Sequence, residues 1–437
     1  MKKYNKKSYL GLIICLGILI FALAGCSSDS DDFVPWYAAT GEEIGPLEDP
    51  PIHVHLTWED DPLTSITIAW QTSHDTPTST VEYSPSGSIE KLYAIGSAHT
   101  YDGASGVIHE VTIRGLEPST RYYYRCGDQE GGWSGVDVFD TGVYPDQDFS
   151  FVVLGDSRSH DKEKRQVVEA IMAEDPLYLT PLFLLHSGDL INDGDHQEQW
   201  DQWFDTMDDL IRHSPLMPCL GNHEVILAGQ LGLGLAPYYY EQFALPGIER
   251  WYSFDYGCVH FTILNSEERL FNLLPGTPQL NWLIEDLEKA DGDPDILWKI
   301  VMFHRPPYST GPHGDDTIIQ RHWCPIFDEY HVDVAFNGHD HLYQRTYPIY
   351  DGKVTDTSES SYDNPTGTVY IVSAGAGAPL YQPDPNNFEK SKHLLANYEV
   401  DYHFCKVEVL PEEKTLHMEA KDRNGNPFDE LWIYKDM

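Results

Sequence analysis

The sequence of 437 residues predicts two folded units, an all-β sandwich followed by an α/β domain. From residue 50 to residue 143, short stretches alternate apolar and polar residues between turn sequences rich in Gly, Ser and Pro. This alternation is typical of a β-sandwich. From residue 148 to residue 437, short apolar stretches are mixed with amphipathic helical patterns, which indicates an α/β domain.

The first unit is predicted from alternating stretches such as residues 65–70 and 80–83. Turn sequences at residues 84–87 and 102–106 separate such stretches. Residues 115–124 are similar to the corner between strands E and F of fibronectin type III domains, so we expect a sandwich of that type. The unit contains no cluster of catalytic residue types, and we therefore place the chemistry in the second unit.

Five short apolar stretches of the second unit each end next to potential metal ligands. Because they are rich in Val, Ile, Leu and Phe and are closed by Gly or Asn, we expect them to be buried strands. The stretches are residues 149–154, 182–185, 216–220, 300–303 and 332–336. The potential ligands that follow them are Asp156, Asp189, Asn222, His304, His339 and His341. Since loops that leave the carboxyl edge of an α/β sheet converge, these residues are expected to meet in space.

The residue types of this set favour particular metals. Carboxylate, carboxamide and imidazole groups together suit Zn, Mn or Fe, whereas oxygen ligands alone would suit Mg or Ca better. The two oxygens of Asp189 could bridge two ions. Two ions about 3.5–4 Å apart can hold the attacking and leaving oxygens of an in-line displacement and lower the pKa of a bound water toward about 7. Such a reaction needs no protein nucleophile.

Two helices of the second unit are predicted from the spacing of apolar residues. Residues 200–211 place Trp203, Phe204 and Met207 on one face, which indicates core packing rather than a cofactor site. Thr277 and Pro278 are typical of an N-cap and first turn, and they predict a helix that continues to residue 287. The polar residues 355–364 are expected to form a loop.

Residues 1–25 predict a secretory signal peptide rather than part of the fold. Four Lys residues precede an apolar stretch at residues 10–24, and small residues stand directly before Cys26. This pattern resembles the lipobox of bacterial lipoproteins, which implies a lipid on Cys26 and a position outside the cytoplasm, anchored to a bacterial membrane. The alternatives are an ordinary signal anchor or a structural cysteine. Residues 26–49 are then an acidic linker after the lipidated residue.

The chain is strongly acidic, with a formal net charge of -42 that becomes -46 once residues 1–25 and their four Lys are removed. Coulomb repulsion from such a charge opposes binding to nucleic acid and to anionic lipid. We therefore expect no nucleic-acid partner and interpret the charge as a solvated surface. The five cysteines after Cys26 are odd in number, so at least one is unpaired, and none has the spacing of a metal site.

The ligand blocks resemble, in order and content, those of purple acid phosphatases within the calcineurin-like metallophosphoesterase superfamily. Tyr343 and Arg345 follow the last block as in that family's Gly-His-x-His-x-Tyr-x-Arg pattern. The family also joins an N-terminal fibronectin-like sandwich to its phosphoesterase domain, so the resemblance covers nearly the whole mature chain. It implies a layered α/β/β/α sandwich for residues 148–437. The blocks are residues 155–158, 188–192, 221–224, 301–304 and 338–341.

This resemblance implies two metal ions, divalent or of mixed valence, held by two sets of ligands that share Asp189. The first ion would be bound by Asp156, Asp189 and His341. The second ion would be bound by Asp189, Asn222, His304 and His339. The expected reaction is the hydrolysis of a small-molecule phosphate ester through attack by a metal-bound hydroxide.

Three further residues receive roles from the same resemblance. His223 would contact the phosphate and assist the leaving group. Glu224 is suited to orient the imidazole of His223 and to fix its tautomer. His313 is the match for a histidine that contacts substrate in the loop after His304.

Two positions depart from the family's pattern. Asn192 stands where the family has a tyrosinate ligand, and it could coordinate through its carbonyl oxygen or make a hydrogen bond near the site. Arg158 stands where other metallophosphoesterases have the histidine of Asp-x-His. A guanidinium cannot ligate a cation, but it could bind phosphate oxygens or form a salt bridge with Asp193 or Asp195.

The sequence leaves the kind of ester open. A monoesterase and a diesterase share this metal chemistry, so an acid-phosphatase-like enzyme and a phosphodiesterase are both compatible with it. A third hypothesis is a binding or adhesive lipoprotein with a catalytically weak phosphoesterase domain, because the first metal site is incomplete. The natural substrate, the metal, the disulfide pairing and the oligomeric state are not predicted by the sequence.

The absence of the tyrosinate gives a prediction about colour. Because Asn192 replaces that ligand, the iron-loaded protein is expected not to be purple. The visible absorption spectrum after loading with Fe checks this, and a strong tyrosinate charge-transfer band would contradict it.

Overall fold

The computed structural model describes residues 49–435, apart from residues 75–77, 87, 89–90, 175–181, 226–234 and 270–272. The expected signal peptide, Cys26 and residues 27–48 lie outside the described residues, so lipidation and the location outside the cytoplasm stay predictions. Within the described ranges, no helix is long and apolar enough to cross a membrane.

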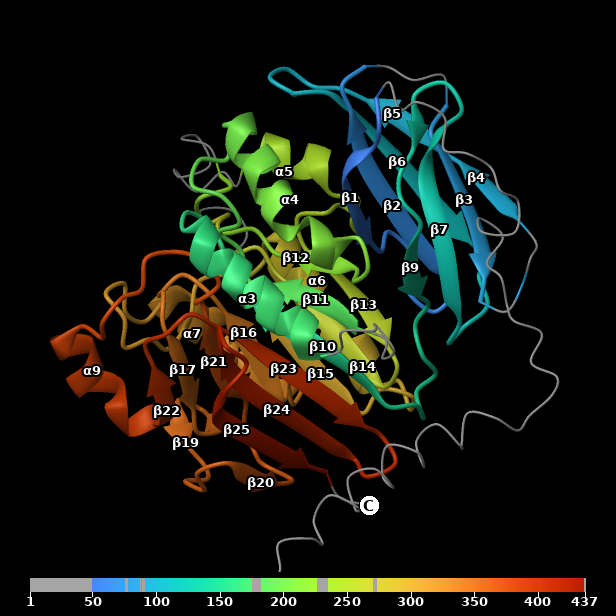
Figure 1. Ribbon diagram of the computed structural model, residues 1–437. Coiled ribbons are helices and arrows are strands. Elements are labelled where there is room, and N and C mark those ends of the chain that lie inside the picture. The colour runs from blue at the N-terminus through green and yellow to red at the C-terminus, as the bar shows by residue number, and fades with distance from the viewer. Residues whose placement is uncertain are drawn as a thin grey trace, which may run out of the picture.

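Residues 52–140 form a β-sandwich, as the alternating pattern predicted (Figure 1). Among the described residues one sheet has the strand order β1-β2-β6-β5, and the other has the order β4-β3-β7-β8 with β9 paired to β7. The strands are β1 (Ile52–Thr57), β2 (Ser65–Thr72), β3 (Thr80–Pro85), β4 (Leu92–Ile95), β5 (Ser97–His99), β6 (Val107–Arg114), β7 (Arg121–Asp128), β8 (Gly132–Trp133) and β9 (Asp137–Asp140). Ile68, Trp70 and Val81 are buried in its core.

The corner predicted at residues 115–124 has a tyrosine hydrogen bond. The backbone N–H of Glu117 donates to the hydroxyl of Tyr122 over 2.9 Å, and the ring of Tyr122 stacks on Phe139 with 5.3 Å between centroids. A tyrosine that bonds back to the chain a few residues upstream fixes the entry into its strand. The more specific likeness to fibronectin type III domains stays a prediction.

The second unit has two mixed sheets that pack face to face. In the described residues the first sheet has the order β12-β11-β10-β23-β24-β25-β20, and the second has the order β13-β14-β15-β16-β21-β17-β22. The first contains β10 (Phe149–Leu154), β11 (Leu182–His186), β12 (Leu216–Pro218), β20 (Ser361–Asp363), β23 (His403–Leu410), β24 (Thr415–Asp422) and β25 (Pro427–Tyr434). The second contains β13 (Tyr252–Tyr256), β14 (Val259–Ile263), β15 (Trp298–Met302), β16 (Val334–Asn337), β17 (Tyr343–Thr346), β21 (Val369–Ser373) and β22 (Leu395–Glu399).

Aromatic side chains fill the space between these sheets. Phe151 of the first sheet lies edge-on to Phe261 and Phe336 of the second, with ring centroids 5.2 and 6.4 Å apart. Phe183 makes a similar contact with Phe261 at 5.4 Å. Aromatic residues bury large apolar areas, so this layer holds the two sheets together.

Helices cover the outer faces, which completes the expected α/β/β/α layering. α3 (Asp161–Glu174) and α4 (Gln197–Ile211) lie over the first sheet (Figure 1). α6 (Pro278–Asp291), α7 (Thr317–His322) and α8 (Cys324–Glu329) share an apolar cluster with the second sheet. The other helical segments are α5 (Pro237–Gln242), α9 (Pro385–Ser391) and the 3-10 turn η2 (Lys392–Leu394). The short strands β18 (Ile349–Tyr350) and β19 (Lys353–Val354) pair with each other.

The sequence located the elements, and the structure corrects several of their bounds. The predicted strands at residues 216–220, 300–303 and 332–336 appear as β12, β15 and β16, displaced by up to two residues at their ends. The loop expected at residues 355–364 contains β20, which pairs with β25. The hydroxyl of Thr277 donates to Leu274 O over 2.6 Å, so Thr277 does not cap α6 with its side chain.

The five cysteines after Cys26 are all buried and free. Burial raises the pKa of the Cys219 thiol well above its usual range. They therefore pack as small apolar residues.

A buried histidine on β14 predicts a pH-dependent contribution to stability. His260 lies between Asp255, 2.6 Å from Nδ1, and Asp286, 3.0 Å from Nε2. Although burial opposes it, these two carboxylates raise the pKa of His260 from 6.5 to about 9. A raised folded-state pKa stabilises the fold fully below pH 6.5, and the stabilisation is lost as the pH rises through about 9.

We expect His260→Gln to lower the free energy of unfolding at pH 6 by up to about 3 kcal/mol, and by much less at pH 10. The half-exposed Asp255 makes this an upper limit, because solvent screens its charge. Urea unfolding at both pH values measures the difference, with the exposed His393→Gln as control. Equal destabilisation at pH 6 and pH 10 would contradict the assignment.

Candidate metal centre

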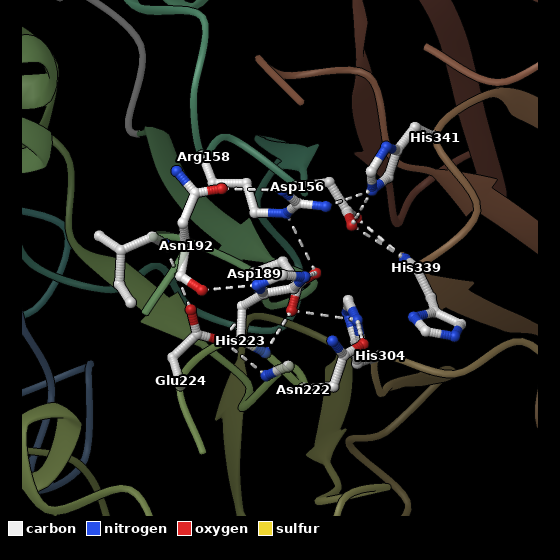
Figure 2. A network of polar contacts seen from close by, with 12 residues as sticks. Asp156, Arg158, Asp189, Asn192, Asn222, His223, Glu224, His304, His339 and His341 are labelled. Carbon is white, nitrogen blue, oxygen red and sulfur yellow. Dashed lines mark hydrogen bonds and ion pairs between the residues drawn. The ribbon is translucent and has the colours of Figure 1, made fainter. Parts of the chain in front are cut away.

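The predicted ligands come together at the carboxyl ends of parallel strands. Asp156 follows β10, Asp189 follows β11 and Asn222 follows β12, and these three strands run parallel. His304 follows β15, and His339 and His341 follow β16, which is parallel to β15. Figure 2 shows the side chains of the six residues converging from the two sheets. The convergence expected from the sequence is confirmed.

Three of the predicted ligands have a left-handed backbone. The φ angles are 53° at Asp156, 57° at Asp189 and 73° at His339. Residues with a β-carbon rarely adopt this conformation, which costs roughly 1–3 kcal/mol each unless the surroundings impose it. The sharp turns directly after the strands aim these side chains back into the site.

Two glycines allow the loops to approach one another closely. A β-carbon at Gly221 would lie 2.3 Å from Asp189 Oδ1, and one at Gly338 would lie 2.5 Å from Asp156 Oδ2. Any side chain at these positions would therefore displace the two carboxylates. This explains why glycine stands in the blocks that carry the ligands.

The side-chain oxygen and nitrogen atoms that could bind a metal lie close together in the site. Ligand atoms of Asp156, Asp189 and His304 all lie within 4.8 Å of one another. His304 Nε2 is 3.3 Å from Asp189 Oδ1 and 3.2 Å from Asn222 Oδ1. His341 Nε2 is 3.3 Å from Asp156 Oδ1.

The backbone fixes the orientation of two imidazoles. His304 Nδ1 donates to Ser187 O over 2.8 Å, and His341 Nδ1 donates to Pro379 O over 2.7 Å. The lone pair on Nε2 of each ring is therefore directed into the site. Backbone carbonyls in these positions are a usual support of metal-binding histidines.

Burial and local charge determine the protonation of the site. Burial raises the pKa of Asp156 well above its usual range. Burial also acts to raise the pKa of Asp189, but the charges of His304, His223 and Arg158 outweigh it and lower that pKa. Burial lowers the pKa of His341 to about 4, so its imidazole is neutral, as a metal ligand must be.

The second predicted ligand set fits a metal ion. The lone pair on His304 Nε2 faces the side-chain oxygens of Asp189 and Asn222, at 3.3 and 3.2 Å. His339 stands beside them, with its ring 5.0 Å from that of His304. Arg305 donates to Nε2 of His339 over 3.0 Å, so a metal bound at this nitrogen would replace that hydrogen bond. Mixed nitrogen and oxygen donors of this kind suit Zn, Mn or Fe.

The first predicted ligand set contains a side chain that does not fit a metal ion. The guanidinium of Arg158 lies among Asp156, Asp189 and His341 (Figure 2). Its Nε is 3.5 Å from Asp189 Oδ2, and its Nη2 is 3.3 Å from His341 Nε2. The salt bridge to a carboxylate that was considered for Arg158 is thus present, but its partner is Asp189 rather than Asp193 or Asp195.

Asn192 binds Arg158 rather than facing the metal ligands. Its Oδ1 accepts hydrogen bonds from Arg158 Nη1 over 2.8 Å and from Ser159 Oγ over 2.9 Å. Of the two roles considered for Asn192, coordination of a metal or a hydrogen bond near the site, the structure shows the hydrogen bond.

Comparison with known proteins gives the family context of this site. Residues 51–141 match the model for the purple acid phosphatase N-terminal domain, and residues 149–343 match that for calcineurin-like phosphoesterases. The chain is 28% identical over 434 residues to mouse acid phosphatase type 7, covering 89% of this chain and 91% of that protein. It is 26% identical to an Arabidopsis thaliana protein named "Probable inactive purple acid phosphatase 1", covering 76% of this chain and 58% of that protein.

A solved structure supports the same architecture. A purple acid phosphatase from yellow lupin seeds superposes with a TM-score of 0.78 at 23% identity, over 89% of this chain and 75% of that one. The chain joins a purple acid phosphatase N-terminal domain to a calcineurin-like phosphoesterase domain. The combination of β-sandwich and α/β phosphoesterase domain predicted from the sequence is thus confirmed.

In the phosphoesterase domain, His223 lies at the exposed side of the site. Its backbone N–H donates to Asp189 Oδ1 over 3.0 Å, and its Nδ1 donates to Asn192 O over 2.6 Å. Nε2 lies 3.8 Å from Asp189 Oδ2, and the side chain is 30% exposed. The expectation that Glu224 orients this imidazole is wrong, because the carbonyl of Asn192 does so.

Glu224 instead holds the two loops that carry Asp189 and Asn222. Its buried carboxylate accepts hydrogen bonds from the N–H groups of Gly221 (2.8 Å), Asp189 (2.9 Å) and Leu190 (2.7 Å). Burial and the charge of Asp189 raise the pKa of Glu224 to about 8, against these N–H groups, which favour the carboxylate. Because Glu224 follows His223 directly in sequence, it was expected to contact that histidine, and this role was missed.

His313 lies at the edge of the site. Its Nδ1 is 2.7 Å from the buried carboxylate of Asp340, and its ring is 4.1 Å from that of His339. The sequence placed His313 correctly but missed Asp340, whose position between His339 and His341 was an available signal. It also missed Tyr381, which stacks on His341 with 4.1 Å between centroids, because nothing local in sequence marks it.

The remaining histidines near the ligand blocks support the site or lie beside it. His186 is fully buried, and its Nε2 is 2.8 Å from Ser157 Oγ. His160 is exposed and pairs with the hydroxyl of Tyr402 over 2.8 Å.

The structure predicts that Glu224→Ala damages both the fold and the metal site. The change leaves four buried N–H groups without an acceptor, so the free energy of unfolding should fall by about 3–5 kcal/mol. The loops of Asp189 and Asn222 lose their common support, so the bound metal should be lost as well. Urea unfolding and metal analysis test this against the exposed control Glu412→Ala, and unchanged stability would contradict it.

Proposed function

We propose that the protein hydrolyses phosphate esters in a metal-dependent reaction outside the cytoplasm. The observation that carries the proposal is the convergence of Asp189, Asn222 and His304 on one point at the carboxyl ends of the strands. The names of the relatives favour the same chemistry, since acid phosphatases cover most of the chain. The expected signal sequence and Cys26 support the location.

Metal ions of the Zn, Mn or Fe class would be held at this point by Asp189, Asn222, His304 and His339. When bound, such an ion lowers the pKa of a water and neutralises charge on the phosphoryl oxygens. The ester is then attacked without a protein nucleophile.

His223 is suited to protonate the leaving oxygen. The carbonyl of Asn192 accepts the proton on Nδ1 and so orients the ring, which leaves Nε2 on the accessible side. Nε2 carries a proton when the imidazole is charged, and it lies 3.8 Å from Asp189 Oδ2. An imidazolium at this place acts as a general acid on the departing alcohol.

His313 and two arginines are suited to bind the substrate. The carboxylate of Asp340 orients the half-exposed His313, as in a carboxylate–imidazole pair. Arg158 and Arg305 face the site from opposite ends of the ligand set, next to His341 and His339 respectively. Their positive charge compensates that of a phosphate in an otherwise acidic protein.

A catalytically weak binding lipoprotein is the second candidate. Arg158 favours it, because the guanidinium lies within the first ligand set. Assays on a generic phosphate monoester and a diester, after loading with Mn, Zn or Fe, decide between the candidates and between the two kinds of ester. A metal-loaded protein that turns over neither ester would favour the binding function.

The proposed function predicts that Asp189→Asn lowers kcat by at least about 100-fold, since the substitution removes the charge at the centre of the ligand set. The measurement is steady-state hydrolysis of the better ester, with metal content determined on the same samples. The exposed Asp295→Asn carries the same change far from the site and should keep full activity. Near-normal turnover by Asp189→Asn would exclude the mechanism.

A further inference from the structure

The three residues of the first predicted ligand set, Asp156, Asp189 and His341, surround the guanidinium of Arg158. Nε faces Asp189 Oδ2 at 3.5 Å, and Nη2 faces His341 Nε2 at 3.3 Å. Within the described part of the chain this buried Nε has no hydrogen-bond partner, although it lies 3.5 Å from that carboxylate. The side chain is only 12% exposed, so water does not replace these contacts.

The lone pair on His341 Nε2, which a metal would need, already accepts a hydrogen bond. The carbonyl of Pro379 takes the proton of Nδ1, so Nε2 is the acceptor of this ring. Arg158 Nη2 donates to that acceptor. A nitrogen lone pair cannot accept an N–H and bind a cation at the same time, so a metal here must first displace the arginine.

Asn192 holds the arginine in this place. Its Oδ1 accepts from Arg158 Nη1 and from Ser159 Oγ. Its backbone N–H donates to the side chain of Gln199 over 2.9 Å, and its carbonyl accepts from His223. The two positions that depart from the family's pattern therefore contact each other, and Asn192 is itself fixed on three sides.

The charges also oppose a metal ion at this position. Asp156 and Asp189 are almost fully buried, and the guanidinium beside them already compensates part of their charge. A divalent ion bound by Asp156, Asp189 and His341 would lie next to the guanidinium and be repelled by it. Moving the guanidinium away would cost its hydrogen bonds to Asn192 and His341.

We propose that Arg158 takes the place of the first metal ion, so that the protein binds one metal ion, at Asp189, Asn222, His304 and His339. The guanidinium supplies the second positive charge of the site. It has five N–H groups, and those that do not face Asn192, His341 and Asp189 are available to phosphate oxygens. Only this last role rests on the proposed function.

The metal content of the whole chain tests the proposal. We expect about one Mn or Zn ion per wild-type chain after loading and gel filtration, as measured by mass spectrometry of the metals. Arg158→His removes the guanidinium and supplies the imidazole of the Asp-x-His pattern, and it should bind about two. The Mn(II) form should give the electron paramagnetic resonance spectrum of an isolated ion in the wild type, and that of an exchange-coupled pair in Arg158→His.

Two results would overturn the proposal. One is a wild-type protein that binds two ions. The other is an Arg158→His variant that still binds one ion while its circular dichroism and melting temperature are those of the wild type. Arg165→His makes the same exchange at an exposed position of α3 and should bind as the wild type does. If Arg158→His does not fold, the number of metal ions per wild-type chain and the Mn(II) spectrum of the wild type still test the proposal.

These measurements need no ester, so they separate this inference from the proposed function. A protein that binds one ion and hydrolyses no ester would overturn the function alone. A protein that hydrolyses esters with two bound ions would overturn the assignment of Arg158 alone.

Discussion

The structure of the site depends on two buried carboxylates that must be compensated by positive charge. Asp156 and Asp189 are 0% and 1% exposed, and they belong to neighbouring parallel strands, so the fold itself brings them together. Charged groups without water require close partners, which the surrounding residues supply as donors or as metal ligands. On one side the partner is a guanidinium. On the other side His304 and Asn222 converge on Asp189, where we propose a metal ion.

The sandwich supports this arrangement although it holds no predicted site residue. Its strand β1 packs on α4, where the ring of His55 lies 4.9 Å from that of Phe204. The neighbouring Trp203 donates from Nε1 to Ser157 Oγ over 2.8 Å, next to Asp156. Gln199 of the same helix accepts from the backbone of Asn192. α4 thus links the N-terminal domain to both loops of the first ligand set, which gives a physical reason for joining the two domains.

The sequence predicted the strands and the convergence of the ligands because both follow from local patterns. Short apolar runs such as residues 149–154 specify buried strands, and the carboxyl ends of parallel strands meet whatever their distance in sequence. The direction of a side chain within a loop has no such local signal. Glu224 was expected to turn toward its neighbour His223, but four backbone N–H groups draw it to the other side.

Contacts between loops that are distant in sequence could not be predicted from the sequence either. Arg158 and Asn192 are 34 residues apart, and each was interpreted separately as a departure from the family's pattern. Only the fold shows that they form a pair. Asp340 was overlooked for a different reason, since its position between His339 and His341 marks it as near the site but does not show that it pairs with His313.

An asparagine is a better neighbour for Arg158 in this site than the family's tyrosinate would be, for reasons of charge. A tyrosinate is an anionic ligand that stabilises a highly charged ion such as Fe(III), and it adds a negative charge that one guanidinium cannot balance beside two carboxylates. The carboxamide of Asn192 is neutral and accepts hydrogen bonds from Arg158 and Ser159 without adding charge. Placing a guanidinium where a trivalent ion would lie lowers the positive charge by two, and the loss of the tyrosinate offsets one of these charges. The two substitutions together therefore change the charge of the site less than the arginine alone would.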